Sequence, residues 1–397
     1  MLSYKYLLDI AMILLSTKIF GLISRKFKMP QVVGALLAGI ILGPALLDIL
    51  HETDFIHKMA ELGVIVLMFT AGLEADIKEL KKTGKAAFVI AVLGVVIPLV
   101  GGFAVAYLYN NGTGVIDNKT LLQDVFIGVI LTATSVSITV ETLKELGKLN
   151  SKSGNTILGA ALIDDVLGVI LLTLITSLSD SSVSLSIVFF KIIAFFIFSG
   201  VIGVIFNKLF KLWFSKYDKD LRRFIIVAFA LCLILSYIAE EFFGVADITG
   251  AFIAGLIISN TEKTKYINSR FETLSYMILS PIFFASIGIK VEISSMTMSI
   301  LAFTIILLII SILSKILGCS IGAKIFKYTN REAIQIGTGM VSRGEVALIV
   351  ANKGIAIGLL NSTFLAPIVI VVVITTIITP VLLEFAYSKN KNLNTVS

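Results

Sequence analysis

The sequence predicts an all-α, polytopic membrane protein, and three observations carry this prediction. Apolar residues make up 57% of the 397 residues, charged residues make up 15%, and the mean hydropathy is +1.00. Lys and Arg concentrate in every second loop, and one sequence motif recurs 216 residues further along the chain. A composition this apolar is typical of helical membrane proteins and excludes a water-soluble domain of this length.

Hydropathy predicts about thirteen membrane-spanning helices, because a helix of about 20 mainly apolar residues crosses a bilayer. The expected helices are residues 6–24, 31–50, 57–75, 84–109, 121–143, 155–178, 185–214, 222–243, 246–260, 271–289, 297–323, 332–352 and 362–387. The first is not followed by a small-residue cleavage site, so we expect a retained helix and not a signal peptide. The short tail after the last helix predicts no soluble regulatory domain.

The distribution of basic residues predicts the orientation of the chain. One set of alternate loops, together with the C-terminal tail, holds 24 Lys and Arg residues, whereas the other set holds 5. Cytoplasmic loops of membrane proteins carry such an excess. We therefore expect an odd number of spans, with the N-terminus outside and the C-terminus in the cytoplasm. This distribution also explains the net charge of +7 without a nucleic-acid partner.

A repeated motif relates two distant parts of the chain. Residues 31–43 read QVVGALLAGIILG, and residues 247–259 read DITGAFIAGLIIS. The next predicted helix keeps the offset of 216, because FTAG, ending at Gly72, aligns with ASIG, ending at Gly288. Small residues that let helices pack closely explain each motif singly, but they do not explain an offset shared by two helices.

The repeat predicts two halves of five helices each, residues 31–178 and 246–387. Seven spans separate matching helices, and this odd number means that the two halves are inverted relative to each other in the membrane. Inverted repeats are typical of secondary transporters, whose substrate site lies between the repeats near the midplane.

Two adjacent aspartates lie in the predicted helix 155–178. Asp164 and Asp165 interrupt an otherwise apolar stretch, and an acidic side chain at the bilayer centre costs about 2.5–3.5 kcal/mol on insertion scales. Neighbouring residues on a helix point about 100° apart, so the pair can address two partners. Because like charges this close cannot both ionise freely, we expect a carboxylate that exchanges a proton for a small cation.

Two of the predicted helices contain polar or glycine-rich interruptions. The first reads TATSVS from Thr132, and the second reads GTGMVSRGE and ends at Glu345. Broken helices at such places expose carbonyls and helix ends to an ion, and hydroxyls and carbonyls are suitable ligands for an alkali cation. For the first interruption alone, an intact helix with Ser and Thr bonded back to its own carbonyls is the alternative.

A lysine also lies within a predicted helix. Lys315 follows two apolar turns in the helix 297–323, and a buried lysine needs a partner. We expect Asp164 or Asp165 to be that partner, with snorkelling to the membrane surface as the alternative. For Arg343 and Glu345, pairing with each other or with neighbouring carbonyls in a structural role is the alternative to contact with the ion.

The motifs GALLAGIILGP, TATSVSITVETL, ALIDDVLGVI, SKILG and MVSRGEVALIV together resemble those of the monovalent cation:proton antiporter superfamily, and most closely its NapA-like branch with paired aspartates. The resemblance covers essentially the whole chain. It implies crossed discontinuous helices as in NhaA and NapA, a homodimer in a prokaryotic cell membrane, and elevator-like movement. The mobile core would comprise residues 84–178 and 297–387, and the remaining spans would form a dimerisation scaffold.

The same resemblance implies roles for individual residues. Asp165 corresponds to the aspartate that binds the ion and the proton, and Asp164 to the aspartate that pairs with the membrane lysine, here Lys315. The remaining matches are contacts from the unwound helices: Thr132, Thr134, Ser135 and Glu345, with Ser342 and Arg343 as weaker candidates.

We therefore expect a secondary transporter and not an enzyme: an antiporter that exchanges cytoplasmic Na⁺ or Li⁺ for external H⁺ and serves sodium and pH homeostasis. Exchange would be electrogenic if two protons move per ion, with Na⁺ held at Asp164 and Asp165 and without a cofactor. K⁺/H⁺ exchange or mixed Na⁺/K⁺ specificity is the alternative. An intramembrane aspartyl enzyme is more remote, because it needs carboxylates that face each other, and a buried Lys315 opposes a cation channel.

Overall fold

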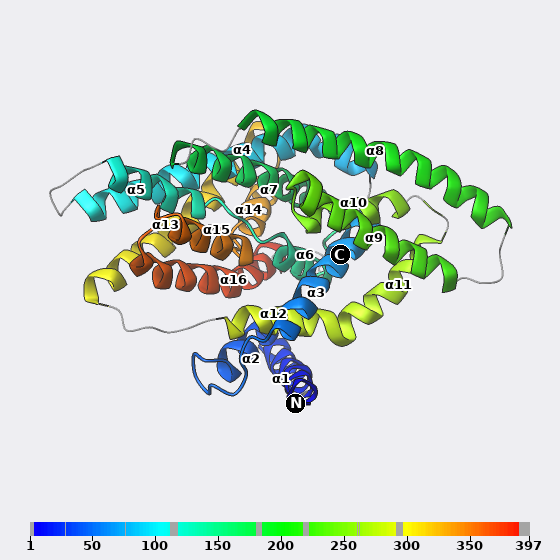
Figure 1. Ribbon diagram of the computed structural model, residues 1–397, viewed down its shortest axis with the longest axis horizontal. Helices are drawn as coiled ribbons and strands as arrows, with labels where there is room; N and C mark the ends of the chain where they lie inside the picture. Colours follow the sequence, from blue (N-terminus) through cyan, green and yellow to red (C-terminus); the bar gives the residue numbers. More distant parts are fainter. Residues whose placement is uncertain are drawn as a thin grey trace, which may run out of the picture.

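The computed structural model is helical throughout the part of the chain that it describes, and it has no β-strand there. The described residues are 4–27, 29–75, 77–111, 118–179, 185–216, 222–259, 261, 263–290 and 297–388. Figure 1 shows an elongated bundle in which the C-terminal helices lie beside helices from the first half of the chain.

In the described part of the chain sixteen α-helices follow one another, with one π-helical turn and one 3₁₀ turn between them. Their bounds are α1 (Lys5–Lys26), α2 (Gln31–Leu42), α3 (Asp54–Glu74), α4 (Ile77–Asn111), α5 (Asn118–Ile130), α6 (Val136–Glu145), α7 (Lys152–Ser179), α8 (Leu185–Lys216), α9 (Arg222–Phe243), α10 (Asp247–Ser259), α11 (Thr264–Leu274), α12 (Ser280–Ile289), α13 (Met298–Ile325), α14 (Asn330–Gly339), α15 (Glu345–Ala356) and α16 (Leu365–Ser388).

Among the described residues, nine helical segments are long and apolar enough to cross a membrane. One of them, residues 264–289, runs through α11, the π-helical turn and α12. The four other predicted spans correspond to shorter elements. Two are the short apolar helices α2 and α10. The other two are the pairs α5/α6 and α14/α15, each of which is interrupted in the middle.

The prediction of one helix over residues 31–50 is wrong in its second half. Helix α2 ends at Leu42, and Gly43 has an extended backbone with ψ −175°. Pro44 follows, and a residue before proline is disfavoured in the helical region. The apolar residues after Pro44 belong to an irregular link that leads to α3.

Local sequence explains where several helices begin. The Thr53 side chain accepts a hydrogen bond from the Ile56 N–H at the start of α3. At the start of α14, Thr329 and Glu332 form a reciprocal capping box. Both arrangements satisfy backbone N–H groups that have no acceptor within the helix.

Four glycines let two pairs of helices approach closely, α2 with α12 and α3 with α10. A Cβ added at any of them would lie between 2.1 and 2.4 Å from a backbone carbonyl oxygen. The contacts are Gly39 with Ala285, Gly255 with Phe69, Gly72 with Phe252 and Gly288 with Leu36. The contact of Gly255 with Phe69 matches that of Gly39 with Ala285, because Gly39 and Gly255, like Phe69 and Ala285, are 216 positions apart. The other two contacts match each other in the same way.

The C-terminal turn of α6 joins this helix to α2 and α3. The Glu145 carboxylate accepts a hydrogen bond of 2.6 Å from the Gln31 N–H, in the first turn of α2. The Lys144 ammonium lies 3.3 Å from the Glu74 carboxylate on α3. An anion at a helix N-terminus is favourable because the first N–H groups point at it.

Replacing Gly39 with Ala tests the close helix packing. The added methyl group overlaps the Ala285 carbonyl, so we expect a loss of stability of about 1–3 kcal/mol, as in other overpacked interiors. Gly200→Ala in α8 is the matched control, because an added Cβ there has nothing within 4 Å. Thermal unfolding in detergent measures both; equal melting temperatures for the two variants would contradict the packing.

Candidate functional site

The two aspartates lie near the middle of α7, which packs against α4, while α4 also packs against α5 and α13. Asp164 is 2% exposed, whereas Asp165 is half-buried. Their side chains leave the helix in different directions, as adjacent helical residues do. The two carboxylates therefore have different surroundings.

Asp164 pairs with Lys315, which is completely buried in α13. The Lys315 ammonium donates to Asp164 Oδ1 at 3.0 Å and to the carbonyl oxygens of Gly94 and Thr132, each at 2.8 Å. An ammonium has three N–H donors, and each has an acceptor here. The expected contact between the two side chains is thus present, and Lys315 does not snorkel to a membrane surface.

The two helix interruptions lie against each other. Residues 131–135 separate α5 from α6, and residues 340–344 separate α14 from α15. The Ser135 N–H donates to the Ser342 carbonyl at 2.7 Å, and the Ser342 hydroxyl donates to the Ser135 carbonyl at 2.8 Å. The alternative of an intact helix at the first interruption is therefore excluded.

Arg343 fills the space beside these interruptions and is 1% exposed. Its guanidinium donates to the carbonyl oxygens of Leu131 at 2.8 Å, Ser311 at 3.0 Å and Val341 at 3.0 Å. Helix C-termini carry unsatisfied carbonyls and partial negative charge. Arg343 therefore bonds to backbone carbonyls next to both interruptions. The side chain of Glu345 lies outside the described part of the chain.

The predicted hydroxyl residues have different surroundings. The Thr132 hydroxyl donates to the Val129 carbonyl at 2.8 Å, so Thr132 offers Lys315 its carbonyl and not its side chain. Ser135 Oγ lies 3.2 Å from Ser137 Oγ. The Thr134 hydroxyl is buried beside the Asp164 carboxylate, with which it interacts.

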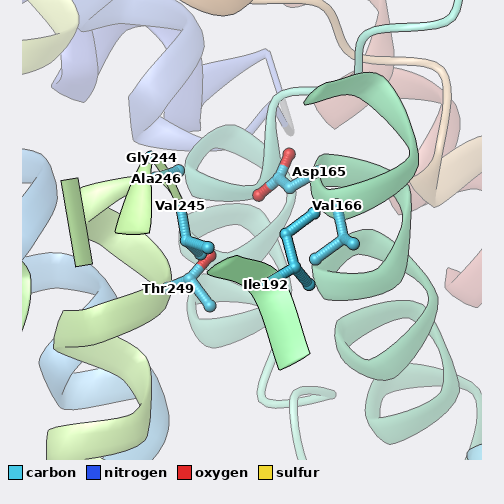
Figure 2. Close-up of a pocket in the computed structure, with 7 residues that line it drawn as sticks. All are labelled: Asp165, Val166, Ile192, Gly244, Val245, Ala246 and Thr249. Atoms are coloured by element: carbon cyan, nitrogen blue, oxygen red, sulfur yellow. The ribbon is translucent and has the colours of Figure 1, made fainter. Parts of the chain in front are cut away.

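Asp165 lines a small pocket between α7, α8 and the first turn of α10 (Figure 2). Its lining residues are Asp165, Val166, Ile192, Gly244, Val245, Ala246 and Thr249. Asp165 thus faces a space that a small ion can occupy, whereas Asp164 is held by Lys315. The adjacent aspartates therefore have different surroundings, Lys315 for Asp164 and the pocket for Asp165.

Several contributors to the site were not predicted from the sequence. The Gly94 carbonyl accepts a hydrogen bond from the Lys315 ammonium, and the Ser311 carbonyl accepts one from the Arg343 guanidinium. The hydroxyl of Thr139 donates to the Gly339 carbonyl at 2.7 Å. The Thr376 hydroxyl donates to the Arg343 carbonyl. Paired helix breaks indicate that carbonyls become available, and Pro98 in α4, which has no N–H, leaves the Gly94 carbonyl without its helical donor.

Comparison with known proteins identifies the family. A family model described as "Sodium/hydrogen exchanger, transmembrane" matches residues 11–387 of this chain. The chain belongs to this family, which confirms the resemblance in the motifs.

Curated relatives cover nearly the whole chain. It is 37% identical over 387 residues to the Na(+)/H(+)-K(+) antiporter GerN of Bacillus cereus, with 97% of each chain covered. It is 40% identical over 380 residues to the probable Na(+)/H(+) antiporter GerT of the same organism, covering 95% of this chain and 98% of the relative. An Na(+)/H(+) antiporter of Enterococcus hirae is 37% identical over 391 residues, with coverages of 96% and 97%.

A solved structure shares the fold. The sodium proton antiporter MjNhaP1 of Methanocaldococcus jannaschii superimposes with a TM-score of 0.73 at 18% identity, covering 98% of this chain and 97% of the other. Similarity at this level of identity concerns the fold alone.

A double-mutant cycle tests the coupling of Asp164 and Lys315. Either Asp164→Asn or Lys315→Gln leaves a buried charge without its partner, which costs about 3–5 kcal/mol in other proteins. We expect the double variant to lose clearly less stability than the sum of the two single losses. Lys152→Gln is the control, because Lys152 is half exposed and lies 3.6 Å from Glu332. Additive losses in thermal unfolding would mean that the buried pair is not coupled.

Proposed function

We propose that this protein is a secondary antiporter that moves Na⁺ or Li⁺ out of the cell in exchange for external protons. The observation that carries the proposal is the position of Asp165: it is half-buried, lines a pocket, and is the neighbour of an aspartate that Lys315 already holds. Membership of the sodium/hydrogen exchanger family and the names of the relatives support it.

The chemistry follows from competition for one carboxylate. Asp165 carries either a proton or a cation, and the Thr134 hydroxyl beside Asp164 is a neutral oxygen donor in the neighbouring interruption. Carboxylate and hydroxyl oxygens are hard ligands that suit an alkali cation. Because proton and cation exclude each other, one site couples their movements without a separate gate.

The transported cation has a second candidate, K⁺. The relative GerN is named an Na(+)/H(+)-K(+) antiporter, whereas the Enterococcus hirae relative is named for sodium alone. Dequenching of a pH-sensitive dye in proteoliposomes with Na⁺, Li⁺ and K⁺ in turn separates these alternatives. A response to K⁺ as strong as that to Na⁺ would replace the sodium assignment by mixed specificity.

We place thirteen crossings in the membrane, in two inverted five-helix repeats, with the N-terminus outside. The thirteen crossings are the nine long segments, the short α2 and α10, and the two interrupted pairs. The excess of basic residues in alternate loops supports the orientation. The glycine contacts that recur with an offset of 216 residues support the repeat.

Alternating access would proceed by movement of a core against a scaffold, in a homodimer in a prokaryotic cell membrane. The core comprises residues 84–178 and 297–387. Figure 1 supports this grouping, since α5, α13, α15 and α16 lie on the left of the view and α9, α10 and α11 on the right, while α4 packs against α5, α7 and α13. The contacts of Lys144 and Glu145 with α3 and α2 cross this boundary and would have to break during movement.

A second titrating group makes exchange electrogenic. Asp165 alone exchanges one proton per Na⁺, but Lys315 can release a proton when the ion arrives and regain it afterwards. Two protons per Na⁺ move one net charge, which is worth about 2.3 kcal/mol per 100 mV. The membrane potential would then drive sodium export without a pH gradient.

Asp165→Asn should abolish exchange. The amide keeps the shape of the side chain but neither ionises nor trades a proton for a cation, so Na⁺-driven pH change in proteoliposomes should fall to the protein-free level. Asp9→Asn is the matched control, because Asp9 is buried in α1, outside the pocket, and should leave exchange intact. Wild-type rates in folded Asp165→Asn would remove Asp165 from the site.

The electrogenic step is tested with an imposed potential. A thiocyanate gradient sets the potential without adding K⁺, and we expect the wild-type rate of Na⁺/H⁺ exchange to change with its sign and size. Lys315→Gln should lose this response even where some exchange survives. Wild-type exchange that ignores the potential would show that Lys315 does not release its proton and is only structural.

A further inference from the structure

Thr249 faces the pocket of Asp165 with an unused hydroxyl. It lies in the first turn of α10, is 1% exposed, and lines the same pocket as Asp165 (Figure 2). Its Oγ1 has no hydrogen-bond partner among the described residues. A buried hydroxyl without a partner is unfavourable, because it has lost its hydrogen bonds to water.

Several other buried threonines of this protein donate their hydroxyls to a carbonyl of their own helix. Thr142 donates to the carbonyl of Ile138 at 2.8 Å, and Thr304 donates to that of Ile300 at 2.7 Å. Such bonds to the carbonyl four residues earlier are the usual solution for threonine in an apolar helix. Thr249 differs from them, and the difference occurs at the pocket of the proposed ion site.

Packing alone does not require the hydroxyl. In the repeat, Thr249 corresponds to Val33, which is 1% exposed in the first turn of α2. Valine has nearly the shape of threonine but no hydroxyl, so an apolar residue fits the corresponding place in the related helix. The hydroxyl is therefore present in α10 but not at the corresponding position of α2.

We propose that the Thr249 hydroxyl is a ligand of the monovalent cation bound at Asp165 in this conformation. This inference rests on the proposed antiport function and extends its site to the scaffold. A hydroxyl oxygen offers lone pairs to a cation that has shed part of its hydration shell. The unused Oγ1 and the Asp165 carboxylate line one pocket from two different helices, α10 and α7.

The Thr249 hydroxyl is available to the cation in only one orientation of the core. Asp165 belongs to the moving core, whereas Thr249 belongs to the scaffold, so the ligand is available only while Asp165 faces this pocket. When the core moves, the cation loses this oxygen. The two orientations of the site therefore bind the cation with different affinities, and Thr249 contributes to that difference.

Three variants test the inference in the full-length protein. Thr249→Val removes the hydroxyl, Thr249→Ser keeps it, and Thr304→Val is the control, because that hydroxyl bonds within its own helix. We measure the Na⁺ concentration that gives half-maximal exchange in proteoliposomes and half-maximal thermal stabilisation in detergent. Thr249→Val should raise both by about tenfold, as expected for one lost polar contact to a charged group, with little change in maximal rate. Thr249→Ser and Thr304→Val should resemble the wild type.

The possible outcomes separate this inference from the proposed function. If the wild type exchanges Na⁺ for protons and Thr249→Val has an unchanged half-saturating concentration, the ligand assignment is wrong and the antiport function stands. If Thr249→Ser loses as much affinity as Thr249→Val, the role is one of packing and the assignment is again wrong. If the wild type shows no Na⁺ response, both fail. Should Thr249→Val not fold, Thr249→Ala answers the same question.

Discussion

The three hydrogen bonds of the Lys315 ammonium hold the site together. A fully buried ammonium is costly unless each of its donors is satisfied. Its acceptors come from two other helices and one interruption: the Asp164 carboxylate on α7, the Gly94 carbonyl on α4 and the Thr132 carbonyl after α5. Lys315 therefore fixes the relative positions of these elements. Lys315 also pairs with Asp164, whereas Asp165 lines the pocket.

The interrupted helices make this arrangement possible. In a continuous helix most carbonyls already accept a hydrogen bond from a backbone N–H of the same helix. The interruptions at 131–135 and 340–344 free such carbonyls, and Arg343 binds those of Leu131 and Val341 beside them. The reciprocal hydrogen bonds of Ser135 and Ser342 then join the two interruptions. Two buried cations and two unwound segments thus stabilise each other in the interior of the protein.

Much of this could be predicted from the sequence, because burying charge in an apolar helix is conspicuous. Asp164, Asp165 and Lys315 were identified in this way, and both interruptions were located by their polar or glycine-rich residues. The backbone acceptor at Ser311 could not be predicted, since every residue has a carbonyl and only the fold brings this one to Arg343. The Gly94 carbonyl does have a signal in the sequence, because Pro98 lies four residues later in α4 and has no N–H to donate to it. Thr249 was missed for a related reason: its hydroxyl is unusual because it has no hydrogen-bond partner among the described residues, which the residue type does not reveal.

The central claim is that Asp165 exchanges a proton for a cation. Sodium-induced proton release from the purified protein in weakly buffered detergent solution tests it most directly, without membranes or gradients. Addition of Na⁺ should acidify the solution in proportion to the amount of wild-type protein, with saturation as the site fills. The Asp165→Asn variant should release no protons while its melting temperature stays that of a folded protein. Equal proton release from folded Asp165→Asn, or none from the wild type at any pH at which it is folded, would contradict the claim.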